Sequence, residues 1–215
     1  MAGELAFAAL TRAYQIEADA ILHALDGINR EDFLRAVDAL KKAPRIAASG
    51  CGHSGICCQH FAHLMCCIER PARFISPAEA VHGASGFLQA GDVMLLASRG
   101  GKTAELLPIL EICQKKGVCV IAATENLDSP LAKGATIVLQ TLVTKEVDRY
   151  NAQGTTSFTV LSVLFDALQA ALLEETGFAN EQFALIHPGG AVGERLNQGK
   201  QSADSAVSSD PSGVV

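Results

Sequence analysis

Two short loops rich in glycine and hydroxyl residues have the residue types best suited to holding an anion. Residues 98–103 read Ser-Arg-Gly-Gly-Lys-Thr, and residues 49–55 read Ser-Gly-Cys-Gly-His-Ser-Gly. Each loop follows a short apolar run and precedes residues with helical spacing, so each should lie at a helix N-terminus. Unpaired backbone N–H groups and the helix dipole favour a phosphate or a carboxylate there. The residues expected to bind a phosphate are Ser54, Ser98, Gly101 and Thr103.

Neither loop completes a nucleotide-binding motif. The loop 98–103 ends like a P-loop, but Leu96 stands where that motif needs its first glycine. The loop 49–55 has the glycine spacing of a dinucleotide site, yet neither Glu69 nor Glu79 is well placed to bind a ribose. The sequence therefore disfavours a nucleotide, and we expect no cofactor.

Four residues able to transfer protons follow predicted strands or turns. Glu105 comes directly after the loop 98–103, Glu146 follows the fifth predicted strand, and His82 follows the second. His187 lies in an Ile-His-Pro-Gly-Gly segment. Carboxylates and imidazoles act as general acids and bases. Plainer interpretations remain open: a carboxylate that complements a helix dipole, a solvated charge, and two turn histidines.

The alternation of strand and helix patterns predicts an α/β fold, with a parallel sheet between two layers of helices. Ligands of such sheets bind at the carboxyl ends of the strands, where both glycine loops fall. Strands are expected at 45–49, 72–75, 92–98, 117–122 and 136–142. Helices are expected at 4–25, from Asn29 to Pro44, and at 53–68, 103–116 and 155–175, with a short turn at 128–133. The first helix has an apolar face made of Phe7, Leu10, Tyr14, Ala18, Ile21 and Leu25.

The length of 215 residues suits one α/β domain. We expect residues 1–43 to form N-terminal helices that pack on a domain over residues 44–197. Residues 198–215 are rich in Ser, Asp and Gly with almost no large apolar side chain, so a disordered tail is expected there.

Charge and hydropathy exclude several classes of protein. A net charge of −6 with no basic stripe disfavours a nucleic-acid partner. No uninterrupted apolar run approaches the roughly 20 residues of a membrane span, and the first residues lack the features of a secretory signal. We therefore expect a soluble, cytoplasmic protein without a membrane partner.

The seven cysteines do not suggest a disulfide framework, because their number is odd and two adjacent pairs share one predicted helix. A reducing cytoplasm fits better. Cys57 with His60, and Cys51 with His53, match no standard zinc spacing, so we expect no metal site. Small buried hydrophobic residues are the favoured interpretation of the cysteines.

Several motifs in order along the chain resemble the sugar isomerase (SIS) domain, and within it the arabinose-5-phosphate isomerases. The resemblance implies a five-stranded, flavodoxin-like αβα sandwich and a homo-oligomer, a dimer or tetramer with sites between subunits. The matching segments are Gly50-x-Gly52-x-Ser54-Gly55, 77–83, 98–105, Lys145-Glu146 and 183–193.

The resemblance also implies an activity, the interconversion of an aldose phosphate and a ketose phosphate. Ser54, Ser98 and Thr103 would hold the phosphate of this small-molecule substrate. The sugar would be surrounded by His82, Glu105, Glu146 and His187. A base moves a proton between two carbons through an enediol, and an acid opens the ring. Either glutamate could be the carbon base, and either histidine the ring-opening group.

The chain departs from the arabinose-phosphate enzymes at three places. His53, which we also count among the catalytic candidates, stands at a lysine position of the family, and Gly100 stands at a position that is typically serine. A lysine is a permanent cation at neutral pH whereas a histidine is mostly neutral, and Arg99 and Lys102 are candidates to restore the charge. The paired CBS domains that follow in biosynthetic members have no counterpart in this sequence.

Two other functions stay open at this stage. One is a phosphosugar-binding sensor without catalysis, since the same domain serves that purpose in some transcription factors. The other is an enzyme on a different phosphosugar, such as a hexulose phosphate, or a lyase or deaminase of amino-sugar phosphates.

Overall fold

A computed structural model describes residues 2–197 of the chain, in two compact units that divide at Glu175 and Thr176. Each unit is considered by itself. The expected division into N-terminal helices, a domain over 44–197 and a tail stays a prediction, and residues 198–215 lie outside the described part.

The first unit contains the parallel sheet and the helices around it. Its strands are β1 (Ile46–Gly50), β2 (Ala72–Phe74), β3 (Val93–Ala97), β4 (Cys119–Thr124) and β5 (Ile137–Gln140). Its helices are α1 (Ala2–Asp26), α2 (Arg30–Lys42), α3 (Gly52–Cys67), α4 (Pro77–Val81), α5 (Leu107–Lys116), α6 (Pro130–Gly134) and α7 (Thr156–Thr176), with a 3₁₀ turn η1 (Ala84–Phe87).

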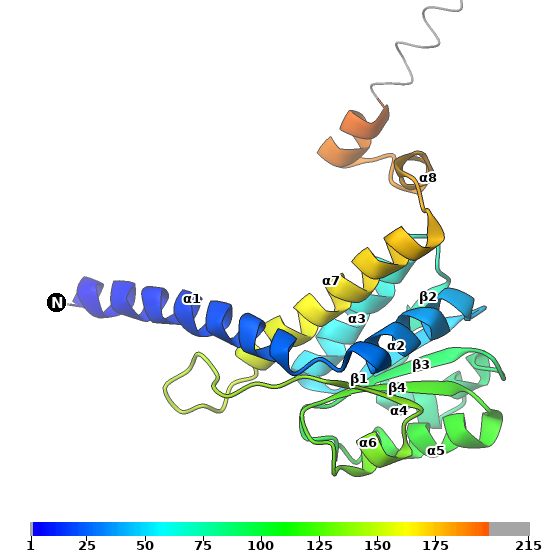
Figure 1. Cartoon of the computed structure of the whole chain (residues 1–215), viewed down its shortest axis with the longest axis horizontal. Helices are drawn as coiled ribbons and strands as arrows, with labels where there is room; N and C mark the ends of the chain where they lie inside the picture. Colours follow the sequence, from blue (N-terminus) through cyan, green and yellow to red (C-terminus); the bar gives the residue numbers. More distant parts are fainter. Residues whose placement is uncertain (1, 198–215) are drawn as a thin grey trace, which may run out of the picture. The chain divides into compact units, whose positions relative to one another are not determined.

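The five strands pair in parallel in the order β2-β1-β3-β4-β5, the flavodoxin-like order, which confirms the predicted fold class. Figure 1 shows α2, α3 and α7 over one face of the sheet and α4, α5 and α6 over the other. β1 and β3 are buried along their whole length because both faces are covered. This three-layer arrangement directs the loops after β1 and β3 to one edge of the sheet.

The hydrophobic core follows the strand periodicity. Met94, Leu96 and Val120 point to the α5 side, where they pack with Leu106 and Ile109. On the other side α7 supplies a set of fully buried side chains, which are Phe165, Leu168 and Leu172. α7 is long and apolar enough to cross a membrane by length and composition alone, and 39% of its most apolar stretch is buried inside the structure.

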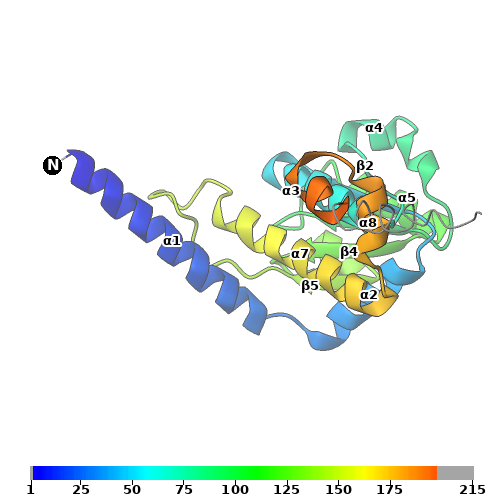
Figure 2. The ribbon, with the colours of Figure 1, turned by 90° about the horizontal axis from the view of Figure 1, so that it is seen from above.

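The α1 helix differs from its expected packing. Leu10, Tyr14 and Leu25 on the predicted apolar face are exposed, and Figure 2 shows α1 running out beyond the sheet. Only the last turns pack, through Ala20 and Ala24 against the residues Val143 and Val160. The sequence pattern identified the apolar face of this helix, but it could not decide whether another segment of the same chain packs against that face.

The starts of α2 and α5 show one helix boundary that the sequence predicted and one that it did not. Asn29 caps α2 as expected, because its Oδ1 accepts the N–H of Asp32 at 3.0 Å. The helix predicted from residue 103 begins only at Leu107, since Ala104–Leu106 form a turn closed by the Leu106 N–H donating to Thr103 O at 3.0 Å. The short helix α4 and the turn η1 were not predicted, because neither is long enough to show a period.

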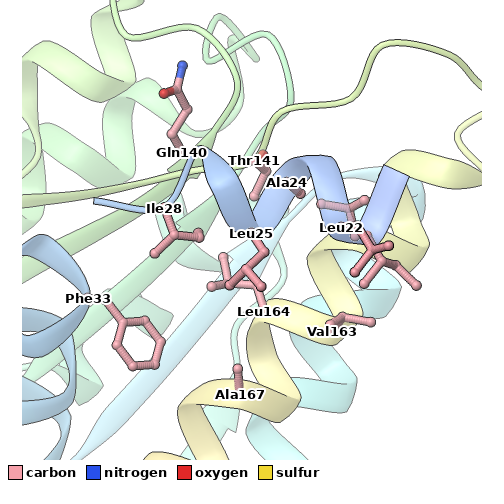
Figure 3. A pocket seen from close by; sticks show the side chains of 12 residues that line it. Leu22, Ala24, Leu25, Ile28, Phe33, Gln140, Thr141, Val163, Leu164 and Ala167 are labelled. Atoms are coloured by element: carbon pink, nitrogen blue, oxygen red, sulfur yellow. The ribbon is translucent and has the colours of Figure 1, made fainter. Parts of the chain in front are cut away.

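An apolar pocket of about 260 Å³ lies where α1, α2, β5 and α7 meet (Figure 3). Leu22, Leu25, Phe33 and Leu164 are among its lining residues. The lining includes no titratable side chain, so this pocket offers no acid, base or anion-binding charge.

The cysteines divide into buried and accessible groups. Cys57, Cys58 and Cys113 are fully buried, as expected, whereas Cys66 is exposed, so the interpretation as buried residues is wrong for that position. Burial raises the pKa of Cys57 to about 12, with a further contribution from Asp166, and raises the pKa of Cys113 to about 11.

These shifts give a prediction for thiol chemistry. Iodoacetamide at about pH 8 should label Cys66 before Cys57, Cys58 and Cys113, because those thiols are buried and stay protonated. Burial raises the thiol pKa values of Cys57 and Cys113 only in the folded protein, so the folded state holds these protons more tightly than the unfolded state does. The resulting contribution to the free energy of unfolding is present below the unfolded thiol pKa of 9.0 and is lost as the pH rises towards 11 and 12. Mass spectrometry of timed samples, with unfolded protein as the control, measures the order. Simultaneous labelling of all four thiols would contradict the packing.

Candidate active site

The pairing of β1 with β3 sets the two glycine loops side by side. Gly50 lies opposite Ala97 in this parallel pair, so both following loops leave the sheet at the same level of its carboxyl edge. The chain also crosses from β2, on one side of β1, to β3 on the other, so the strand order reverses here. Ligands of open parallel sheets bind at such a point.

The glycines of the first loop allow β1 and α3 to approach closely. A Cβ on Gly50 would lie 2.9 Å from the carbonyl carbon of Ser54, and a Cβ on Gly55 would lie 2.6 Å from the oxygen of Gly50. Both approaches are closer than real Cβ contacts. The glycine spacing therefore brings Ser54, in the first turn of α3, next to the end of β1.

The second loop is held in shape by its own polar groups. The Ser98 and Thr103 hydroxyl oxygens lie 2.8 Å apart, and the Gly101 N–H donates to Ser98 Oγ at 3.1 Å. Gly101 has φ +64°, and a Cβ there would lie 2.0 Å from Ser129 Oγ, so only glycine fits. Within residues 2–197 no backbone hydrogen bond uses the N–H groups of Lys102 or Thr103. Free N–H groups of this kind bind anions.

A small pocket lies between these loops and the start of α7. Hydroxyl groups from three elements line it: Ser54 of α3, Ser98 after β3, and Ser157 of α7. Ser157 was not among the predicted site residues. The signal that could have found it is the run Thr155-Thr156-Ser157 at the start of a predicted helix. The full lining is His53, Ser54, Ser98, Arg99, Ala123, Thr141, Ser157, Phe158 and Leu161.

Glu146 lies beside this pocket and is almost completely buried, with 1% of its side chain exposed. Its Oε1 accepts a hydrogen bond of 2.6 Å from Arg99 Nη1. Its Oε2 accepts from the Thr155 hydroxyl at 3.2 Å and from the Ser157 N–H at 3.1 Å. The interpretation of Glu146 as a solvated charge is therefore wrong, because the tertiary structure folds residues 141–157 around it.

The segment that carries Glu146 is ordered by polar contacts. The Asp148 carboxylate accepts the N–H groups of Tyr150, Ala152 and Gln153, and these bonds, chiefly that from Gln153, lower the pKa of Asp148. The Oδ1 of Asn151, a residue with φ +55°, accepts a hydrogen bond of 2.6 Å from the Glu146 N–H. A compact loop of this kind fixes the backbone of Glu146 without a hydrophobic core.

Arg99 is committed to two carboxylates. Besides Glu146, its Nε donates to Glu125 Oε2 at 2.7 Å and its Nη2 donates to the Val143 carbonyl at 3.0 Å. One guanidinium with two carboxylates leaves a net negative charge when both are ionised. The structure therefore does not support the expectation that Arg99 restores the cationic charge of the missing lysine, and Lys102 remains the exposed cation of this loop.

Glu105 is exposed and lies in the turn before α5, near the loop that follows β1. The pKa of the Cys51 thiol is raised by burial and then by the negative charge of Glu105. Glu105 thus lies close to the N-terminus of α3. Within residues 2–197 its carboxylate makes no hydrogen bond or ion pair, in contrast to Glu146.

Two of the candidate histidines, His53 and His82, belong to the first unit and occupy different positions. His53 is exposed in the first turn of α3 and lines the pocket, and its ring meets the edge of Phe158 with centroids 6.2 Å apart. Gly154 lies against that ring, since a Cβ there would be 3.5 Å from His53. His82 is exposed at the end of α4 and does not line the pocket.

His187 belongs to the second unit, which contains α8 (Asn180–Ile186) and a helical segment at 190–197. It ends α8, its ring lies 5.0 Å from Phe183, and its buried Nδ1 has no hydrogen-bond partner among the described atoms. Gly193 packs against the His187 carbonyl, where a Cβ would lie 2.5 Å from the oxygen. The glycine of this motif therefore serves a tight turn.

In the part of the chain that the structure describes, no group of three His, Cys, Asp or Glu side chains is arranged to hold a metal ion. The pocket is lined by the hydroxyl groups of Ser54, Ser98 and Ser157, which can donate to an anionic ligand.

Among curated proteins, the chain is similar to two named arabinose 5-phosphate isomerases. It is 40% identical to KdsD of Pseudomonas aeruginosa over 186 residues, covering 86% of this chain and 57% of that protein. It is 35% identical to GutQ of Escherichia coli K12 over 167 residues, covering 77% and 52%. The chain thus spans just over half the length of the curated relatives it matches.

Two solved structures match across their whole length. A Listeria monocytogenes protein that bears the name sugar-phosphate isomerase gives a TM-score of 0.85 with 37% identity, over 88% of this chain and 100% of that chain. An Escherichia coli protein solved with a sugar phosphate gives 0.82 with 28% identity, over 87% and 100%.

The model of the SIS domain family matches residues 39–171, which include β1 to β5, both glycine loops and Glu146. On these grounds the chain belongs to the SIS domain family.

Proposed function

We propose that this protein is an aldose–ketose isomerase of sugar phosphates, with arabinose 5-phosphate and ribulose 5-phosphate, or a related pair, as its substrates. The observation that carries the proposal is the convergence of Ser54, Ser98 and Ser157 beside the buried Glu146 carboxylate. The names of the relatives with 35–40% identity support the same reaction class.

The phosphate would bind at the two glycine loops. Ser54, Ser98 and Thr103 offer hydroxyl donors, and the free N–H groups of Lys102 and Thr103 add backbone donors. Hydrogen bonds to an ionised phosphate are about twice as strong as those between neutral groups. The anion therefore contributes more to binding than the sugar does.

The sugar would then lie between the two glutamates. A base removes the proton from C2 while an acid protonates the carbonyl oxygen of C1, which gives an enediol. The base returns a proton to C1 as the C2 hydroxyl loses its own, which completes the ketose. Glu105 suits the mobile base because its carboxylate is exposed and unpaired within the described residues, and His53, His82 and His187 are candidates for the oxygen and ring-opening steps.

We also propose that a second copy of the chain covers the apolar face of α1, to form a homo-oligomer. Phe7 is 69% exposed and Tyr14 is 74% exposed on this helix. A contiguous apolar face of this kind marks an interface. We propose in addition that the protein is located in the cytoplasm.

A phosphosugar sensor is the alternative, and proton exchange separates it from the enzyme. An isomerase exchanges the proton beside the carbonyl with solvent D2O, whereas a sensor is stabilised by its ligand without exchange. A panel of pentose, hexose, hexulose and amino-sugar phosphates tests the substrate at the same time.

One prediction of the proposed function concerns the phosphate. Arabinose 5-phosphate should stabilise the protein in a thermal-shift titration far more than arabinose does. Ser98→Ala should weaken binding of the phosphosugar roughly 10- to 100-fold, because a hydrogen bond to a charged group contributes about 1.5–3 kcal/mol. Equal stabilisation by the two sugars would contradict the assignment of the loops.

A further prediction concerns the glutamates. Glu105→Gln and Glu146→Gln should each lower the isomerisation rate by about 10²- to 10⁴-fold, the usual effect of removing an acid or base. Glu111→Gln, on the exposed face of α5, is the control with an equal change of charge. Rates equal to that control, with folding intact by circular dichroism, would reject the catalytic roles.

His53 gives a prediction for pH dependence. His53→Lys should raise the activity on arabinose 5-phosphate at about pH 8 relative to about pH 6, compared with the unmodified protein, because lysine keeps its charge at the higher pH. His63→Lys, an exposed change on the same helix, is the matched control. An unchanged pH profile together with lost activity on another sugar phosphate would indicate that His53 sets specificity instead.

A further inference from the structure

Arg99 connects three segments of the candidate site. It follows β3, and it reaches Glu125 after β4 at 2.7 Å, Glu146 at 2.6 Å and the Val143 carbonyl at 3.0 Å. It also lines the pocket together with Ser54 and Ser98. One side chain thereby joins the second glycine loop to the segment that carries Glu146.

The three acceptors require the shape of a guanidinium group. Nε, Nη1 and Nη2 each donate to a different partner, and these donors lie in one rigid plane. A lysine has the same charge but concentrates its donors on one atom, so it cannot reach all three acceptors. Arg99 therefore supplies geometry in addition to charge.

Glu146 depends on this contact more than Glu125 does. With 1% exposure Glu146 has almost no water to solvate its charge, whereas 33% of the Glu125 side chain is exposed. The other partners of the Glu146 carboxylate are a hydroxyl and a backbone N–H, both uncharged. A buried carboxylate that loses its counter-ion is strongly destabilised, so without Arg99 the Glu146 side chain would move from its place.

We propose that Arg99 is a positioning residue, which holds the Glu146 carboxylate in a fixed place beside the sugar-phosphate pocket. This inference rests on the proposed isomerase function. Arg99 acts through Glu146, so its loss should affect turnover more than substrate binding.

The chain contains a matched control. Arg45 forms an equally buried ion pair, in which its Nη2 lies 2.9 Å from Oδ2 of Asp92; the arginine is 38% exposed in both pairs and Asp92 is fully buried. Arg45 and Asp92 lie just before β1 and β3, at the amino edge of the sheet and away from the pocket. Arg45→Lys thus damages stability in a comparable way without touching the site.

The experiment compares Arg99→Lys, Arg45→Lys, Glu146→Gln and the double variant Arg99→Lys with Glu146→Gln, by kcat and KM on the sugar phosphate that the D2O panel identifies. Arg99→Lys should lower kcat by about 10²-fold, the effect expected of a misplaced catalytic group, with a smaller change in KM. Arg45→Lys should lower the Tm but leave kcat unchanged. The double variant should have the kcat of Glu146→Gln, since both changes remove the same contribution.

Chemical rescue adds a measurement that would not change if Arg99 only stabilised the fold. Guanidinium ion at millimolar concentration should raise the kcat of Arg99→Ala but not that of Glu146→Gln. If Arg99→Ala does not fold, the Arg99→Lys comparison carries the test alone.

The outcomes separate this inference from the proposed function. An Arg99→Lys variant with the kcat of the unmodified protein, or losses that simply add in the double variant, would overturn the positioning role while isomerase activity stands. An unmodified protein that exchanges no proton with any sugar phosphate would overturn the proposed function and this inference together.

Discussion

The parallel pairing of β1 with β3 is the constraint on which the site depends. Its register places Gly50 opposite Ala97, so two loops that are far apart in sequence begin side by side. Because both strands are buried on both faces, this register cannot slip without exposing the core, and a slip of one residue would reverse every side chain. The rigid sheet therefore fixes where the hydroxyl and N–H donors lie, and the glycines of both loops allow the backbone to reach those positions.

Around this fixed edge the site is built by polar contacts instead of apolar packing. The segment after β5 folds on itself through Asp148 and Asn151, and it closes over a carboxylate that would be unstable there alone. Arg99 compensates the burial of Glu146 and is itself oriented by Glu125 and a carbonyl group. Networks of this kind contribute little net stability when complete but are costly when one member is removed. The arrangement thus favours a single geometry of the site.

The contrast between the two glutamates follows from the same network. Glu146 is held by three donors in a nearly dry environment, whereas Glu105 lies in water at the start of a turn. Two carboxylates in such different surroundings would suit the different tasks that the proposed reaction requires. The two residue departures from the resembled enzymes, His53 and Gly100, lie on the two glycine loops, while the order of the strands is that of the family fold.

The sequence by itself determined the α/β class, the five strands to within a few residues, the cap at Asn29 and the order of the family motifs, because these depend on local periodicity and on residues at fixed spacing. It could not decide the environment of side chains whose partners are distant in the chain. Glu146 has the sequence context of a solvated charge, yet it is buried because Arg99, 47 residues away, neutralises it. Ser157 joins the pocket only because α7 begins over the edge where β1 and β3 end, and the apolar face of α1 is exposed because the described part of the chain offers partners only to its last turns. Which distant residues surround a side chain or pair with its charge is a property of the assembled tertiary structure, and the local spacing of residues does not specify it.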